Sequence, residues 1–218
     1  MTDKTYIFVF PIFLMGGEMK KLLLVSFIAF ILVAYSGYNV VSQEKTLLDD
    51  INSYIYSLHY VNVSVPNGSL VWEANFIYSI VLANIKYSPN FSGSFPKLFR
   101  GGGNCKDFTL AFLTLLSQKK NFTAYIIRSN IEYNGSILGH MFPVIYYKGK
   151  YYLFDRAFGI EYNSSSIEAI LNVYRQYNVT FEKVEVFKLE FGGGKVKKIS
   201  YDFLKSSHLN FMCLRDRV

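Results

Sequence analysis

The spacing of apolar residues predicts helices in the first half of the chain and strands in the second. From Cys105 to Gln118, apolar residues recur with a helical period and form one stripe that can face a core. After residue 120 the pattern changes to short runs rich in β-branched and aromatic residues, which is typical of strands. We expect helices over 44–60, 72–86, 105–118 and 167–177, and strands over 122–129, 140–147, 150–155, 180–191 and 195–203.

This order, helices first and mostly antiparallel strands afterwards, predicts an α+β fold. Lys148-Gly149 between two strand runs is a hairpin signal, and residues 87–103 read as a long polar connection of the kind that often borders a functional site. There is no internal repeat and no second-domain linker in the sequence, so residues 44–218 are expected to form one domain.

The N-terminal region carries an uncharged apolar run. Lys20-Lys21 precede residues 22–41, a stretch of 20 residues that is long enough to cross a hydrocarbon core. The positive-inside rule would then place the domain outside a cell membrane, anchored by a single pass. The same segment, residues 19–43, also fits a cleaved secretory signal, which would give a secreted protein. Residues 1–18 fit neither reading, and one hypothesis is that translation starts at Met19.

Glycosylation motifs support an extracytoplasmic location. About two Asn-X-Ser/Thr triplets are expected by chance in a chain of this composition, yet the sequence has clearly more, all downstream of the apolar run. The acceptor positions are Asn62, Asn67, Asn90, Asn121, Asn134, Asn163 and Asn178. We therefore expect a glycoprotein.

Composition and charge narrow the choice of partners. A hydrophobic content of 51% indicates a packed globule, and the net charge of +7 is not gathered into a basic run or a known nucleic-acid motif. The basic cluster Lys195, Lys197 and Lys198 is typical of a solvated strand face, so no nucleic-acid partner is expected. Without a metal-binding or phosphate-binding motif, the sequence predicts no metal and no cofactor, and His59 and His208 are expected to be structural or surface residues.

Cys105 stands where the glycine run 101–103 meets the predicted helix. Asn104 is a good N-cap, and Asp107 can complete a capping-box-like pair with it. A cysteine in the first turn faces unpaired N–H groups and the positive end of the helix dipole, an arrangement that favours a thiolate. The position therefore suits a sulfur nucleophile.

A cysteine nucleophile needs a base, and the base needs an orienting carboxylate. If Lys148 and Gly149 form a two-residue turn, Phe142 lies opposite Asp155, and His140 shares a sheet face with both. His140 and Asp155 then become diagonal cross-strand neighbours, close enough for their side chains to meet. Pro143 cannot donate to the ladder and could mark an edge or a bulge there.

The chain resembles the transglutaminase-like superfamily of papain-like cysteine enzymes over residues 70–160. The matching features are Gly103-Asn104-Cys105 before a helix, His140-Met141-Phe142 opening a strand, and Tyr152-Leu153-Phe154-Asp155 closing the next. The resemblance implies a Cys-bearing helix packed on an antiparallel sheet, with Cys105 as nucleophile, His140 as general base and acid, and Asp155 as its orienter. It also implies a protein or peptide substrate.

The chain departs from the family pattern in its tryptophans. Phe142 stands where many members have tryptophan, and Trp72 is the one candidate for the tryptophan that helps to stabilise the oxyanion in some members. The backbone N–H of Cys105 is an oxyanion donor that needs no such residue.

Several alternatives stay open. Cys105 could pair with Cys213 in a disulfide, which would block the nucleophile. The fold could serve as a non-catalytic surface module that binds protein or glycan, or the chain could be a papain-like hydrolase of another topology. For an enzyme, hydrolysis of amide bonds is favoured over cross-linking because water is abundant outside the cell.

Overall fold

A computed structural model describes residues 17–61, 63–118 and 120–204. The chain divides into two compact units, Met1–Gln43 and Glu44–Val218. Helix α1 (Gly17–Tyr56) contains the apolar run 22–41, and a short 3-10 helix, Ser57–Tyr60, follows it. None of the helices, as far as their residues are described, is long and apolar enough to cross a membrane. Residues 1–16, which bear on the start-site hypothesis, lie outside the described part.

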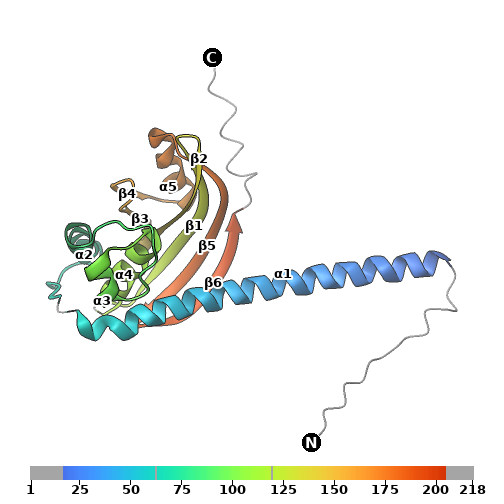
Figure 1. The fold of residues 1–218 in the computed structure, drawn as a ribbon, viewed down its shortest axis with the longest axis horizontal. Helices are drawn as coiled ribbons and strands as arrows, with labels where there is room; N and C mark the ends of the chain where they lie inside the picture. Colours follow the sequence, from blue (N-terminus) through green and yellow to red (C-terminus); the bar gives the residue numbers. More distant parts are fainter. Residues whose placement is uncertain (1–16, 62, 119, 205–218) are drawn as a thin grey trace, which may run out of the picture. The chain divides into compact units, whose positions relative to one another are not determined.

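The second unit is an α+β domain, as the sequence predicts, and it is built on one six-stranded antiparallel sheet (Figure 1). The strands lie in the order β4-β3-β2-β1-β5-β6, so neighbours in the sheet are mostly neighbours in sequence. Its helices are α2 (Leu70–Asn84), α3 (Phe95–Gly101), α4 (Cys105–Ser117), α5 (Ile167–Val173) and the 3-10 helix η3 (Tyr174–Tyr177). Its strands are β1 (Phe122–Tyr133), β2 (Ser136–Tyr147), β3 (Lys150–Asp155), β4 (Ile160–Ser164), β5 (Thr180–Gly192) and β6 (Lys195–Leu204).

The sheet has a buried cluster on each face. On one face α2, α3 and α4, together with the end of α1, cover sheet residues such as Met141 and Ile145. On the other face α5 and η3 cover residues such as Phe142 and Val144. Because successive residues of β2 point to opposite faces, this one strand contributes to both clusters.

The glycine run before α4 is required by close backbone packing. A Cβ on Gly102 would lie 2.4 Å from the Lys86 carbonyl oxygen, and its φ of +79° is one that L-residues rarely adopt. A Cβ on Gly103 would lie 2.4 Å from a Leu98 methyl carbon, whereas one on Gly101 would meet nothing within 4 Å. Gly103 therefore lets α4 start directly against α3, and Gly102 lets the chain pass close to the Lys86 backbone.

The structure adds two elements that the sequence pattern did not predict. Helix α3 lies inside the expected connection 87–103 and begins with a proline at its first turn, where the missing N–H has no cost. Strand β4 is short and exposed on most of its residues, so it carries no apolar alternation and is held by pairing with β3. The β1–β2 hairpin is also longer than predicted, because Asn134 and Gly135 both adopt positive φ and form a tight turn.

Candidate active site

The start of α4 fixes Cys105 through a complete capping box. The Asn104 side chain accepts from the N–H groups of Lys106 (3.0 Å) and Asp107 (3.3 Å), and Asp107 accepts from the Asn104 N–H (3.0 Å). Within the described ranges, the Cys105 N–H donates to no acceptor. The first turn of α4 therefore presents one free donor, and it belongs to the residue that carries the thiol.

Asp107 anchors this turn to two other segments. Its carboxylate is fully buried and accepts from the N–H groups of Ser92 and Gly93 at 2.9–3.1 Å. The Tyr54 hydroxyl on α1 also donates to it at 2.5 Å. Burial first, and then this carboxylate, raise the pKa of Tyr54, which keeps the phenol protonated as a donor. Sequence reasoning found Asp107 as a cap but missed this wider role.

His140 and Asp155 meet as the hairpin argument predicts. The β2–β3 ladder has the expected register, with Tyr147 opposite Lys150 and Val144 opposite Leu153. The ladder stops there, since the next residue, Pro143, has no N–H to donate. Beyond this point the two side chains bridge the strands directly: His140 Nε2 lies 2.6 Å from Asp155 Oδ2.

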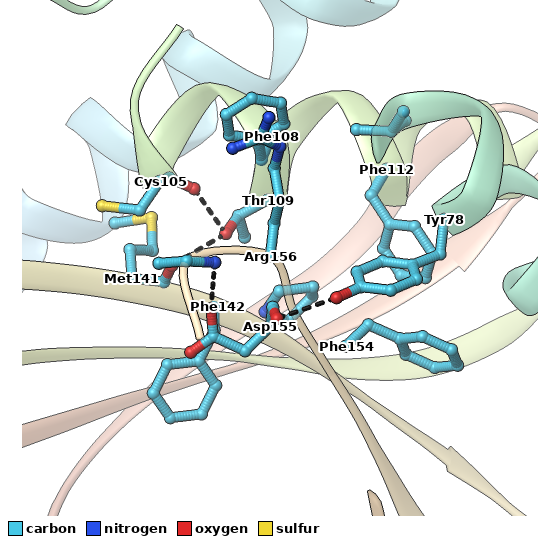
Figure 2. Close-up of a pocket in the computed structure, with 13 residues that line it drawn as sticks. Tyr78, Cys105, Phe108, Thr109, Phe112, Met141, Phe142, Phe154, Asp155 and Arg156 are labelled. Atoms are coloured by element: carbon cyan, nitrogen blue, oxygen red, sulfur yellow. Dashed lines mark hydrogen bonds between the residues drawn. The ribbon is translucent and has the colours of Figure 1, made fainter. Parts of the chain in front are cut away.

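Asp155 is held in one orientation from several sides. Its side chain accepts from the Ala157 N–H at 2.8 Å and from the Tyr174 hydroxyl on η3. Its backbone carbonyl accepts from the Tyr78 hydroxyl on α2 at 2.8 Å, a bond visible in Figure 2. Burial, followed by the charge of Asp155, raises the pKa of Tyr174 and so keeps its hydroxyl protonated. Neither tyrosine is marked by any sequence pattern, and both were missed.

The His140 ring lies in an aromatic enclosure. The rings of Phe142, Phe158 and Tyr174 pack around it with centroid distances of 5.4, 5.4 and 6.3 Å, and His140 is only 5% exposed. Burial by itself would lower the pKa of His140. The charge and hydrogen bond of Asp155, aided by Cys105, outweigh burial and raise this pKa to about 9. The imidazolium form is therefore favoured at neutral pH.

Cys105 completes the constellation from the opposite layer. Cys105 lies close enough to His140 to contribute, through a hydrogen bond and its charge, to the raised pKa of the ring. Because Nε2 is engaged by Asp155, Nδ1 is the nitrogen left for the sulfur. The sulfur also lies 4.0 Å from the Gly139 carbonyl oxygen, and Cys105 is a free cysteine. Cys213, its proposed disulfide partner, lies outside the described residues.

Thr109 links the cysteine helix to the histidine strand. Its hydroxyl lies 2.8 Å from the Cys105 carbonyl oxygen and 3.2 Å from the Met141 carbonyl oxygen. Figure 2 shows this bridge. Among the side chains drawn there, the Cys105 sulfur lies at one end, and Tyr78 and Phe112 lie at the other. The cavity that these residues line has a volume of about 20 Å³, room for no more than water. A substrate must therefore approach the half-buried Cys105 from solvent and not from this cavity.

The predicted oxyanion tryptophan and the other histidines are not among the residues that form this site. Trp72 on α2 is not among the residues that line the cavity; it is 46% exposed and stacks on Phe76. The same helix contributes Tyr78 to the cavity instead. His59 is exposed and hydrogen-bonds the Tyr56 carbonyl, and His208 lies outside the described residues.

The predicted glycosylation acceptors can be placed except for Asn62, which lies outside the described residues. The other acceptors are all exposed: Asn67, Asn90, Asn121, Asn134, Asn163 and Asn178. Surface exposure is what an acceptor side chain requires.

This chain matches no known protein-family model, and no curated protein matches it. Across the described part of the chain, no group of histidine, cysteine and acidic residues is arranged to hold a metal ion. What can be said of function therefore comes from the geometry of Cys105, His140 and Asp155.

Proposed function

We propose that this protein is an extracytoplasmic cysteine enzyme that hydrolyses amide bonds or transfers their acyl group, on a transglutaminase-like core. The observation that carries the proposal is the hydrogen-bonded pair of His140 on β2 and Asp155 on β3, with Cys105 on α4 beside it. The Cys105 sulfur lies 4.0 Å from the carbonyl oxygen of Gly139, the residue before His140. These elements follow one another as α4, the β1–β2 hairpin and β3, which is the order that the resemblance implies. A structural histidine would not need both a buried carboxylate and a neighbouring thiol.

The arrangement supports acyl transfer in two steps. The Cys105 sulfur bonds to the substrate carbonyl carbon, and the Cys105 N–H donates to the oxygen as it gains negative charge. The C–N bond then breaks, and the amine leaves with a proton from His140. Next, His140 takes a proton from water, the resulting oxygen nucleophile attacks the thioester, and the acid is released as the sulfur leaves. Asp155 orients the imidazole throughout and stabilises its charged form.

The extracytoplasmic location is part of the proposal. It rests on Lys20-Lys21 before the apolar run and on the exposed glycosylation acceptors. A membrane anchor and a cleaved signal both satisfy these observations. N-terminal sequencing of the protein from its native source, with and without glycosidase treatment, distinguishes the two.

Alkylation of Cys105 tests the catalytic constellation. In a Cys213→Ser background, iodoacetamide reacts with Cys105 at pH 6 about 100-fold faster than with an ordinary thiol, which is only about 0.3% ionised there. His140→Ala removes most of this advantage, whereas His59→Ala retains it because His59 is exposed and hydrogen-bonds its own helix.

Slow alkylation that is indifferent to His140 contradicts the enzyme and favours a non-catalytic surface module. If Cys105 is reactive, peptide-library turnover with and without an added primary amine separates hydrolysis from transfer. Acyl-amine products that exceed the hydrolysed acid would identify a transferase.

A further inference from the structure

In the part of the chain that the structure describes, one edge of strand β2 has no strand partner next to the candidate nucleophile. It pairs with β1 from Ser136 to Tyr146, but with β3 only from Val144 to Tyr147. Among the described residues, no strand pairs with the other edge of β2 between Ser136 and Pro143. Its first four residues, 136–139, are all exposed.

The outward backbone groups of this edge can be assigned. The two-residue turns at both ends of β2 close with the pairs Tyr133–Ser136 and Tyr147–Lys150, which exchange both hydrogen bonds. Even-numbered residues of β2 therefore bond to β1, and odd-numbered ones point away from it. The carbonyl of Gly139 agrees, since it points toward Cys105. The N–H and C=O groups of Ile137 and Gly139 thus face outward, as a neighbouring strand requires.

This edge leads directly to the thiol. The Gly139 carbonyl oxygen is 4.0 Å from Cys105 Sγ, and His140 is the next residue of the strand. A Cβ added to Gly139 would meet nothing within 4 Å, so the sheet face at this residue is open. A peptide paired with Ile137 and Gly139 would pass beside the sulfur.

The edge also lacks the usual protection against pairing. Natural sheets discourage new strands with charged residues, and the outer strand β6 has the exposed cations Lys195, Lys197 and Lys198. Residues 136–139 carry no charge, and Ile137 and Leu138 are 63% and 49% exposed. Because these two side chains point to opposite faces, each face offers an apolar neighbour to an added strand.

We propose that the substrate is an extended peptide segment that adds to the free edge of β2 at Ile137 and Gly139 and so delivers its carbonyl to Cys105. This inference rests on the proposed function and narrows the substrate class. A helical segment cannot bind this way, because its backbone groups already bond to one another. Apolar residues near the reacting carbonyl are favoured by Ile137 and Leu138.

Two electrophiles with one reactive group test the proposal. In Cys213→Ser protein, acetyl-Val-Ala-Val-Ala chloromethyl ketone can pair with the edge, whereas acetyl-alanine chloromethyl ketone is too short to do so. We expect the long reagent to alkylate Cys105 at least tenfold faster. Ile137→Pro removes one outward N–H, a change that an edge strand tolerates, and should reduce this ratio about five- to tenfold. Ile137→Val keeps the N–H and should keep most of the ratio.

A wild-type ratio near one, or a ratio that Ile137→Pro leaves intact, overturns the proposal. Hydrogen exchange in a Cys105→Ala protein gives a second measurement that needs neither the proline nor a reactive thiol. Millimolar acetyl-Val-Ala-Val-Ala-amide should slow exchange of the Ile137 and Gly139 amides and leave Leu138, already bonded to β1, unchanged. Unslowed exchange also overturns the proposal. If Cys105 is unreactive but these amides are protected, the proposed enzyme fails and the peptide site stands.

Discussion

Two buried carboxylates flank the candidate nucleophile, and they serve different ends. Asp107 on α4 binds backbone N–H groups of the 92–93 loop and of Asn104, together with a tyrosine hydroxyl. Asp155 at the end of β3 binds one backbone N–H, the Tyr174 hydroxyl and the His140 ring. Both residues are at most 1% exposed.

The difference between them lies in what each holds. The partners of Asp107 are mostly backbone groups, so its charge stabilises the position of the 92–93 loop and of the first turn of α4. The partners of Asp155 include one titratable ring, so its charge changes the protonation of His140. A buried carboxylate is therefore not by itself a sign of catalysis; the nature of its partners decides. The following predictions test this distinction.

The largest effect is expected from Asp107→Ala. The change removes the buried carboxylate that accepts from the partly buried N–H groups of Ser92, Gly93 and Asn104, and should lower the free energy of unfolding by about 3–5 kcal/mol. Urea denaturation measures it. Lys106→Ala is the matched control, because its ion pair with Asp50 is partly exposed and should contribute about 1 kcal/mol or less. Equal losses in the two variants would contradict the bracing role.

The second effect is a pH dependence of stability, which arises because Asp155 raises the pKa of His140. The pKa of His140 is about 9 in the folded protein and about 6.5 when unfolded. Its contribution, on the order of a few kcal/mol, is complete below pH 6.5 and is lost as the pH rises through 9. Urea denaturation from pH 6 to 10 should show this slope in the wild type and in His59→Gln, but not in His140→Gln. A slope that persists in His140→Gln would assign it to another group.

A smaller effect separates the two carboxylates directly. Asp155→Asn removes the charge that opposes burial, so the pKa of His140 should fall well below 9, toward 6.5 or under it. Asp107→Asn should leave the pKa of His140 raised, because Asp107 is not among the groups that shift it. Ring-proton NMR titration of His140 measures both. Parallel shifts in the two variants would show that the carboxylates are not distinct.

The smallest effect is expected from Tyr174→Phe. The aromatic contact with Phe142 is kept and one hydrogen bond to Asp155 is removed, which should cost about 1 kcal/mol of unfolding free energy. Tyr177→Phe, a neighbour that is 41% exposed, should be nearly neutral. A thermal melt of both variants gives the comparison. A neutral Tyr174→Phe would remove this hydroxyl from the support of Asp155.

Local signals in the sequence were enough to predict the α+β class, the capped start of α4 and the β2–β3 register. Each depends on residues close in the chain: Asn104 and Asp107 three apart, and Lys148-Gly149 between two strand runs. The apolar period of α4 and the Lys148-Gly149 turn, in which both residues have positive φ, are likewise local signals. The structure buries α4 all round from Asp107 to Ser117, more than the single predicted stripe. The meeting of His140 and Asp155 followed from that register, since one tight turn fixes every pair along a hairpin.

Only the tertiary structure decided what surrounds this pair. Tyr78 and Tyr174 reach Asp155 from helices 77 and 19 residues away in sequence, and Tyr54 reaches Asp107 across 53 residues. Neither these tyrosines nor the free edge of β2 has a local signature, because each depends on which distant segment packs there and which does not. A sequence encodes turns and caps within a few residues, whereas the environment of a buried charge is set by the packing of whole layers.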